Sequence, residues 1–107
     1  PSASEITACR PWLLREVELV RPRIVVCLGA VAAQTFLGRT FRVTQHRGEV
    51  ISMTGYLLIP TLHPSAVLRM PTPQARQQAE IDLRGDLMRV RELDGVSESD
   101  AALYAGP

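Results

Sequence analysis

A short apolar segment constrains the fold of this chain more than any other feature. Residues 24–28 read Ile-Val-Val-Cys-Leu, between Pro22-Arg23 and Gly29-Ala30. A β-branched run with no polar alternation is typical of a strand covered on both faces, as in parallel sheets, so residues 23–28 are predicted to form one. Apolar positions 6, 13, 14, 17 and 20 before it, and the apolar segment 31–37 closed by Gly38, predict a helix on each side. This helix–strand–helix order predicts the α/β class with a parallel sheet.

The remaining predicted elements complete one small domain. The first helix begins in a Ser2-Ala3-Ser4-Glu5 capping box, and Pro11 must kink it or begin its second half. Residues 39–49 form a basic loop, and residues 50–53 and 56–59 form two strands around a tight turn. Thr72-Pro73 opens a last helix, with apolar positions 79, 83, 87 and 90. We expect residues 1–93 to form a partial three-layer α/β/α sandwich with a small, mainly parallel sheet, and residues 94–107 a flexible acidic tail.

Charge is distributed unevenly along the chain. The formal net charge is +1, but residues 1–79 carry nine Arg against four Glu, and residues 80–107 carry three Arg against seven acids. All twelve basic residues are Arg, which a GC-rich genome explains as readily as a function does. Guanidinium groups also suit phosphate, and five Arg against one acid in residues 39–79 indicate nucleic-acid binding. Because no apolar segment approaches the roughly 18 residues of a membrane span and no signal peptide is visible, we expect a cytoplasmic protein without a membrane partner.

The second predicted hairpin strand ends in a stiff segment that contains His63. Prolines at 60 and 64 flank it, and a rigid polar loop after a strand is a frequent ligand site in α/β proteins. The imidazole of His63 either hydrogen-bonds a neighbouring group to hold the turn, or donates to an oxygen on which negative charge develops. Val67 and Leu68 are apolar where solvent would favour polar residues, so this loop is predicted to push into a partner. The other histidine, His46, is interpreted as a solvated loop residue.

Several groups that a complete active site would need are missing. The only acid between residues 19 and 79 is Glu49, and the chain has neither a phosphate-binding glycine motif nor a nucleophile elbow. The two cysteines cannot by themselves form an iron–sulfur site, which needs about four ligands. Cys27 lies inside the apolar strand, whereas Cys9 lies on the first helix beside Arg10. The residues that are present therefore look like one half of an active site.

The ordered motifs resemble one known family. His63-Pro64-Ser65, followed by Val67-Leu68-Arg69, is similar to the His-Pro-Ser loop of the uracil-DNA glycosylase superfamily, hydrolases of base-excision DNA repair. Residues 4–93 as a whole resemble its iron–sulfur (family 4/5-like) branch, and residues 41–50 look most like the uracil-crosslinking subgroup. The segments that carry this likeness are Cys9-Arg10-Pro11-Trp12-Leu13, Pro22, Ile24-Val25-Val26, Leu28-Gly29, Ala32 and Arg47-Gly48.

The resemblance implies a role for each matching residue. His63 would be the catalytic residue, stabilising negative charge on uracil O2 as the glycosidic bond breaks. Val67 and Leu68 would wedge into the minor groove while the base is flipped out, with Arg69 nearby on DNA. Ser65 and the Arg47-Gly48 turn would lie near the phosphate backbone. Cys9 would be one ligand of a [4Fe-4S] cluster, present only where an N-terminal half supplies the others.

The chain also departs from the family pattern. The Gly-Glu-x-Pro-Gly motif, the uracil-reading Asn region and the remaining cluster ligands lie N-terminal to the matching segment in the family, and none is found here. The chain thus resembles a C-terminal half, and alone it is expected to be inactive and to hold no cofactor. We expect it to self-associate or to pair with such an N-terminal half, and to contact uracil-containing DNA. The alternative is a non-catalytic nucleic-acid-binding or assembly module.

Overall fold

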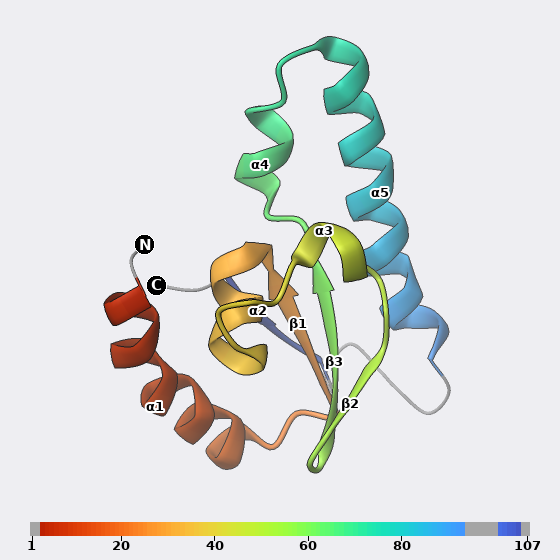
Figure 1. Ribbon diagram of the computed structural model, residues 1–107. Coiled ribbons are helices and arrows are strands. Elements are labelled where there is room, and N and C mark those ends of the chain that lie inside the picture. Colours follow the sequence, from red (N-terminus) through yellow and green to blue (C-terminus); the bar gives the residue numbers. More distant parts are fainter. Residues whose placement is uncertain (1–2, 94–100, 106–107) are drawn as a thin grey trace.

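The computed structural model describes residues 3–93 and 101–105, with side chains described from residue 10 (Figure 1). Its elements are α1 (Ala3–Val20), β1 (Ile24–Leu28), α2 (Gly29–Leu37), α3 (Val43–His46), β2 (Ile51–Met53), β3 (Tyr56–Thr61), α4 (Pro64–Leu68), α5 (Pro73–Glu92) and β4 (Ala101–Tyr104). Within these ranges the strands form one four-stranded sheet in the order β2-β3-β1-β4. β1 pairs in parallel with β3 and β4, and β2 and β3 form an antiparallel hairpin. The predicted α/β class with a small, mainly parallel sheet is confirmed.

The apolar run of β1 is covered on both faces of the sheet. Val25 and Cys27 pack with Leu58 against α1 and α2 on one face. Ile24 and Val26 pack with Ile59 on the other face, where the partly buried Val90 of α5 packs against them. Figure 1 shows the same arrangement, with α1 and α2 on one side of the strands and α5 on the other. Because neither face of β1 meets water, its sequence has no polar alternation.

The long periodic elements lie where the sequence predicts them. β1, α2 and α5 match the predicted ranges to within two residues, and α1 runs through Pro11 to Val20. The predicted capping box at residues 2–5 lies outside the described side chains. These elements form the frame that holds the sheet.

Three short segments differ from the prediction. Residues 43–46 and 64–68, expected as loops, are the one-turn helices α3 and α4, which are too short to show helical periodicity. β3 extends to Thr61 and so includes Pro60, which the sequence placed in the loop. The Pro60 carbonyl accepts from the Gly48 N–H at 2.7 Å, on the side of β3 that pairs with β2. The β2 pairing ends at Leu58, so the lack of an N–H on Pro60 costs no ladder hydrogen bond there.

The acidic tail prediction is wrong for its last described residues. Ala101–Tyr104 form β4, which pairs in parallel with β1 from Ile24 to Cys27. Tyr104 packs edge-on against Phe36 at 5.8 Å between ring centroids, so this segment belongs to the main core. The four residues are mostly apolar, but they follow a polar, acidic stretch that hid their β propensity.

Three large apolar residues of α1 are exposed among charged ones. Trp12, Leu19 and Val20 expose 75%, 73% and 65% of their surface. Exposed apolar surface of this kind is consistent with the expected self-association, which stays a prediction. None of the helices in the described residues is both long and apolar enough to cross a bilayer.

Candidate functional site

His63 lies at the edge of the sheet where two parallel strands end. β1 ends at Leu28 and its partner β3 ends opposite at Thr61, so the residues that follow them meet at one edge. Gly29 has φ +90°, and a Cβ atom placed on it would lie 3.0 Å from the Cβ of His63. Glycine is therefore required at 29 both by its backbone conformation and by the close approach of His63. Ligand sites of α/β sheets form at this kind of edge.

A cleft of about 480 Å³ opens beside His63, which is within the size range of small-molecule sites. Its walls come from the ends of β1 and β3, from α3 and α4, and from the residue after β4. The lining residues are Leu28, Gly29, Ala30, Val31, Val43, Thr44, Leu62, His63, Ser65, Ala66, Arg69, Met70 and Ala105. No Asp or Glu is among these described residues, so a base or a water-positioning carboxylate must come from elsewhere.

Ser65 determines which ring nitrogen of His63 carries the proton. The backbone N–H of Ser65 donates to His63 Nδ1 at 3.0 Å, and Ser65 Oγ lies 2.8 Å from the same nitrogen. A backbone N–H can only donate, so Nδ1 is the acceptor and the hydrogen of the neutral ring is on Nε2. Arg69 Nη2 donates to Ser65 Oγ at 3.2 Å, which leaves the hydroxyl hydrogen free to point at Nδ1. The result is a neutral imidazole whose Nε2–H is available as a donor.

The two apolar residues of α4 have opposite environments. Val67 is 6% exposed and packs with Leu62 and Ala79 in a small core between α4 and α5. Leu68 is 72% exposed at the end of the helix. Of the two residues predicted to wedge into DNA, Leu68 alone is accessible in this structure, and Val67 anchors the helix that presents it.

This difference predicts separate effects for two matched truncations. Val67→Ala is expected to lower the free energy of unfolding by about 1–2 kcal/mol, because it removes buried methyl groups. Leu68→Ala is expected to change it by less than about 0.5 kcal/mol, since exposed side chains contribute little. Urea denaturation of both variants measures the difference. Equal losses would contradict the assignment of Val67 to the core and of Leu68 to the surface.

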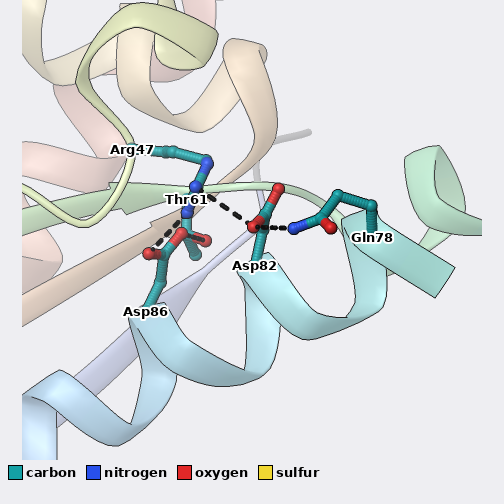
Figure 2. A network of polar contacts seen from close by, with 5 residues as sticks. All are labelled: Arg47, Thr61, Gln78, Asp82 and Asp86. Carbon is teal, nitrogen blue, oxygen red and sulfur yellow. Dashed lines mark hydrogen bonds and ion pairs between the residues drawn. The ribbon is translucent and has the colours of Figure 1, made fainter. Parts of the chain in front are cut away.

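Arg47 and Gly48, predicted to lie near DNA phosphates, lie against Asp86 of α5, and Figure 2 shows the contacts of Arg47. Arg47 Nη1 binds Asp86 Oδ1 at 2.9 Å and Nη2 binds Asp82 Oδ1 at 3.2 Å. Thr61 Oγ1 donates to Asp86 Oδ2 at 2.6 Å, and Gln78 donates to Asp82 at 3.0 Å. The Arg47 side chain is 33% exposed, and two of its guanidinium nitrogens are paired with carboxylates of α5. Its role toward DNA stays a prediction.

Sequence reasoning missed Asp86. Its carboxylate is buried on the inner face of α5, in line with Ala79, Leu83 and Val90, whereas the predicted core residue Leu87 is 38% exposed. Positions 79, 83, 86 and 90 keep helical spacing, so the signal was an acid inside an otherwise apolar stripe.

The other candidate residues do not contribute to the cleft in the described part of the chain. His46 Nδ1 pairs with Glu49 Oε2 at 2.5 Å, and Phe41 stacks on its ring at 5.1 Å. Cys27 is fully buried in the core, and this burial raises the pKa of its thiol to about 12. The side chain of Cys9 lies outside the described residues. No group of three metal-ligating side chains occurs among those described. The two cysteines in the sequence are fewer than the about four thiolates that a [4Fe-4S] cluster needs.

Comparison with known proteins identifies the family. Residues 1–84 match the profile of the Uracil DNA glycosylase superfamily. The chain belongs to this superfamily. Its match to the type-4 uracil-DNA glycosylase of Thermotoga maritima is 37% identical over 79 residues, which are 72% of this chain and 41% of the relative. The resemblance drawn from the motifs is confirmed for the superfamily and its 4/5-like branch.

Two further relatives agree with this placement within the superfamily. The type-5 uracil-DNA glycosylase of Pyrobaculum aerophilum is 41% identical over 68 residues, 61% of this chain and 30% of the relative. The type-4 enzyme of Archaeoglobus fulgidus is 32% identical over 93 residues, 78% of this chain and 45% of the relative. The chain thus spans less than half the length of these relatives. Nearness to the uracil-crosslinking subgroup stays a prediction.

Proposed function

We propose that this superfamily chain supplies the oxyanion-stabilising histidine and the DNA-inserting loop of a uracil-DNA glycosylase, which hydrolyses the N-glycosidic bond of uracil in DNA. The observation that supports it most is the fixed tautomer of His63, with Nδ1 held by the Ser65 amide at 3.0 Å. Glycosidic cleavage leaves negative charge on the departing uracil. A preoriented N–H donor stabilises that charge as it develops, and needs no reorganisation to do so.

In this proposal each residue of the loop has a separate task. The target nucleotide leaves the duplex and its base enters the cleft, where His63 Nε2–H donates to uracil O2 as the bond breaks. Leu68, exposed at the end of α4, inserts where the base has left, while buried Val67 holds α4 in place. Arg69, Ser65 and the Arg47-Gly48 turn lie toward the phosphate backbone. Water is activated by groups outside this chain, since no carboxylate lines the cleft in its described part.

The same proposal covers partners, cofactor and location. Cys9 is one ligand of a [4Fe-4S] cluster whose other ligands lie on an N-terminal half, and this chain pairs with that half or with a second copy of itself. The protein acts in the cytoplasm. Catalytic turnover needs the complete domain, and the isolated chain binds uracil-containing DNA without releasing uracil.

Fluorescence anisotropy and a release assay on single-stranded DNA with one uracil or one thymine test the proposal. We expect tighter binding to the uracil strand, loss of that preference in His63→Ala, and no uracil release by the isolated chain. Binding should also weaken steeply with salt, because Arg–phosphate contacts release counterions. Uracil release by the isolated chain would contradict its expected inactivity.

The alternative function, a nucleic-acid-binding or assembly module without chemistry, predicts another result. The local excess of Arg in residues 39–79 favours it. Binding would then be salt-dependent but indifferent to uracil, and His63→Ala would leave it unchanged. No binding to either strand at low salt would contradict both functions.

A further inference from the structure

Asp86 is a buried carboxylate with both oxygens occupied. Its side chain is 7% exposed, Oδ1 accepts from Arg47 Nη1 at 2.9 Å, and Oδ2 accepts from Thr61 Oγ1 at 2.6 Å. A charged group in such a place is costly unless its hydrogen bonds are complete. This carboxylate does not line the cleft beside His63. Its two donors, Arg47 and Thr61, indicate which segments it holds in place.

Both donors are connected to His63, Thr61 along the chain and Arg47 through a backbone hydrogen bond of its neighbour Gly48. Thr61 is the last residue of β3, two positions before His63 in the chain. Arg47 precedes Gly48, whose N–H donates to the carbonyl of Pro60 at 2.7 Å. The end of β3 is thus held by the Gly48 backbone at Pro60 and by the Asp86 side chain at Thr61, the second of which Figure 2 shows.

The closeness of Gly48 to α5 makes this arrangement rigid. A Cβ on Gly48 would lie 2.4 Å from Asp86 Oδ1, so the turn and the carboxylate are in direct contact. Asp82, one turn earlier on α5, binds the second nitrogen of Arg47 at 3.2 Å and fixes the guanidinium plane. The Arg47-Gly48 turn, helix α5 and the end of β3 therefore meet at Pro60 and Thr61. These two residues immediately precede Leu62 and His63 in the chain.

We propose that Asp86 is a positioning residue for His63, acting through Thr61 and the Arg47-Gly48 turn. The hydrogen bond between Asp86 and Thr61 fixes the position of the end of β3. That position determines where the His63 backbone lies against Gly29 and where the His63 ring accepts from the Ser65 amide. This positioning role of Asp86 also gives Arg47 a structural part beside its proposed place near the phosphate backbone. Its catalytic consequence rests on the proposed function, but the positioning itself does not.

Thr61→Val, which removes the hydroxyl and keeps the volume, tests the inference, with Thr61→Ser as the variant that restores the donor. The readout is the pair of ¹⁵N ring shifts of His63, assigned with His63→Ala because the chain has only two histidines. Wild type and Thr61→Ser are expected to show the wide separation of a single neutral tautomer. Thr61→Val is expected to lose that separation while the ring signals of His46 stay in place. Unchanged His63 signals in folded Thr61→Val would overturn the inference.

If Thr61→Val does not fold, Arg47→Met provides a second test, because it removes the other hydrogen-bond donor to Asp86. The Arg47 side chain is 33% exposed and Met keeps the apolar stem, so the loss of stability should be smaller than for a change that displaces Asp86 itself, and the His63 signals should shift as in Thr61→Val. Glu80→Gln, on the exposed face of α5, is the control for a substitution on α5 itself and should leave the signals unchanged. His63 signals that stay at their wild-type positions in Arg47→Met would count against Asp86 as the positioning group.

Binding to the uracil strand separates this inference from the proposed function. Thr61→Val should weaken binding to the uracil strand by no more than His63→Ala does, because the lost hydrogen bond to Asp86 acts on DNA only through the His63 ring. The double variant with His63→Ala should bind no more weakly than His63→Ala alone, because both changes act through the same ring. Additive losses would overturn the positioning role. Absence of DNA binding in wild type would instead remove the proposed function and leave the ring-shift result standing.

Discussion

Replacing Gly48 by alanine is expected to lower the free energy of unfolding by about 3–5 kcal/mol, a large part of the stability of a domain this size. Gly48 has φ +78°, where any other residue costs about 1–2 kcal/mol. The new Cβ would also lie 2.4 Å from Asp86 Oδ1, so the carboxylate must move away from Arg47 and Thr61. Separating a buried ion pair is the larger part of the loss, reduced here because Arg47 is partly exposed.

Gly55→Ala is the matched control for this prediction. Gly55 has φ +89°, and a Cβ placed there meets nothing within 4 Å. It therefore has the backbone strain without the steric conflict, and should lose only about 1–2 kcal/mol in urea denaturation. The difference between the two variants measures what the contact between the turn and Asp86 contributes. Equal losses would mean that Asp86 moves aside without cost, and would contradict the rigid contact on which the positioning of β3 depends.

The sequence predicts the frame of this fold because its long elements have clear patterns. β1 has an apolar run, and α1 and α5 have helical periodicity over many residues, so their packing could be anticipated. The short helices α3 and α4 and the strand β4 have four or five residues each. Their conformation depends on contacts with residues distant in the sequence, as where β4 pairs with β1. Local pattern carries no information about such pairing.

The sequence predicts those residues of the candidate site that come directly after a strand. His63 lies at the strand end that the sequence indicated, and its hydrogen bonds to Ser65 are local. The link from Asp86 to Thr61 spans 25 residues, and only the folded chain brings them together. Val67 could not be told from Leu68 by composition, because the burial of one and the exposure of the other depend on where α5 packs.

His63→Ala is expected to reduce uracil excision by about 10²–10³-fold in a complete domain, the usual effect of removing one donor from an oxyanion site. A complete domain is obtained by joining this chain to the part of the Thermotoga maritima type-4 enzyme that it does not match, since the match covers 41% of that relative. The loss in the single-turnover rate at saturating enzyme should exceed the loss in binding to the uracil strand, because charge develops on the base only as the bond breaks. Single-turnover release of uracil from labelled DNA measures it.

His46→Ala is the matched control, since it removes the only other histidine of the chain from an exposed pair with Glu49. It should leave the rate unchanged, although it removes the same ring from the same domain. Both variants should unfold at nearly the temperature of the unsubstituted domain, because neither ring belongs to a buried core cluster of the described residues. Equal rates in the two histidine variants would exclude His63 as the oxyanion donor. A chimaera that unfolds cooperatively but releases no uracil would show that this chain no longer supplies the donor, because every other catalytic group would come from a working enzyme.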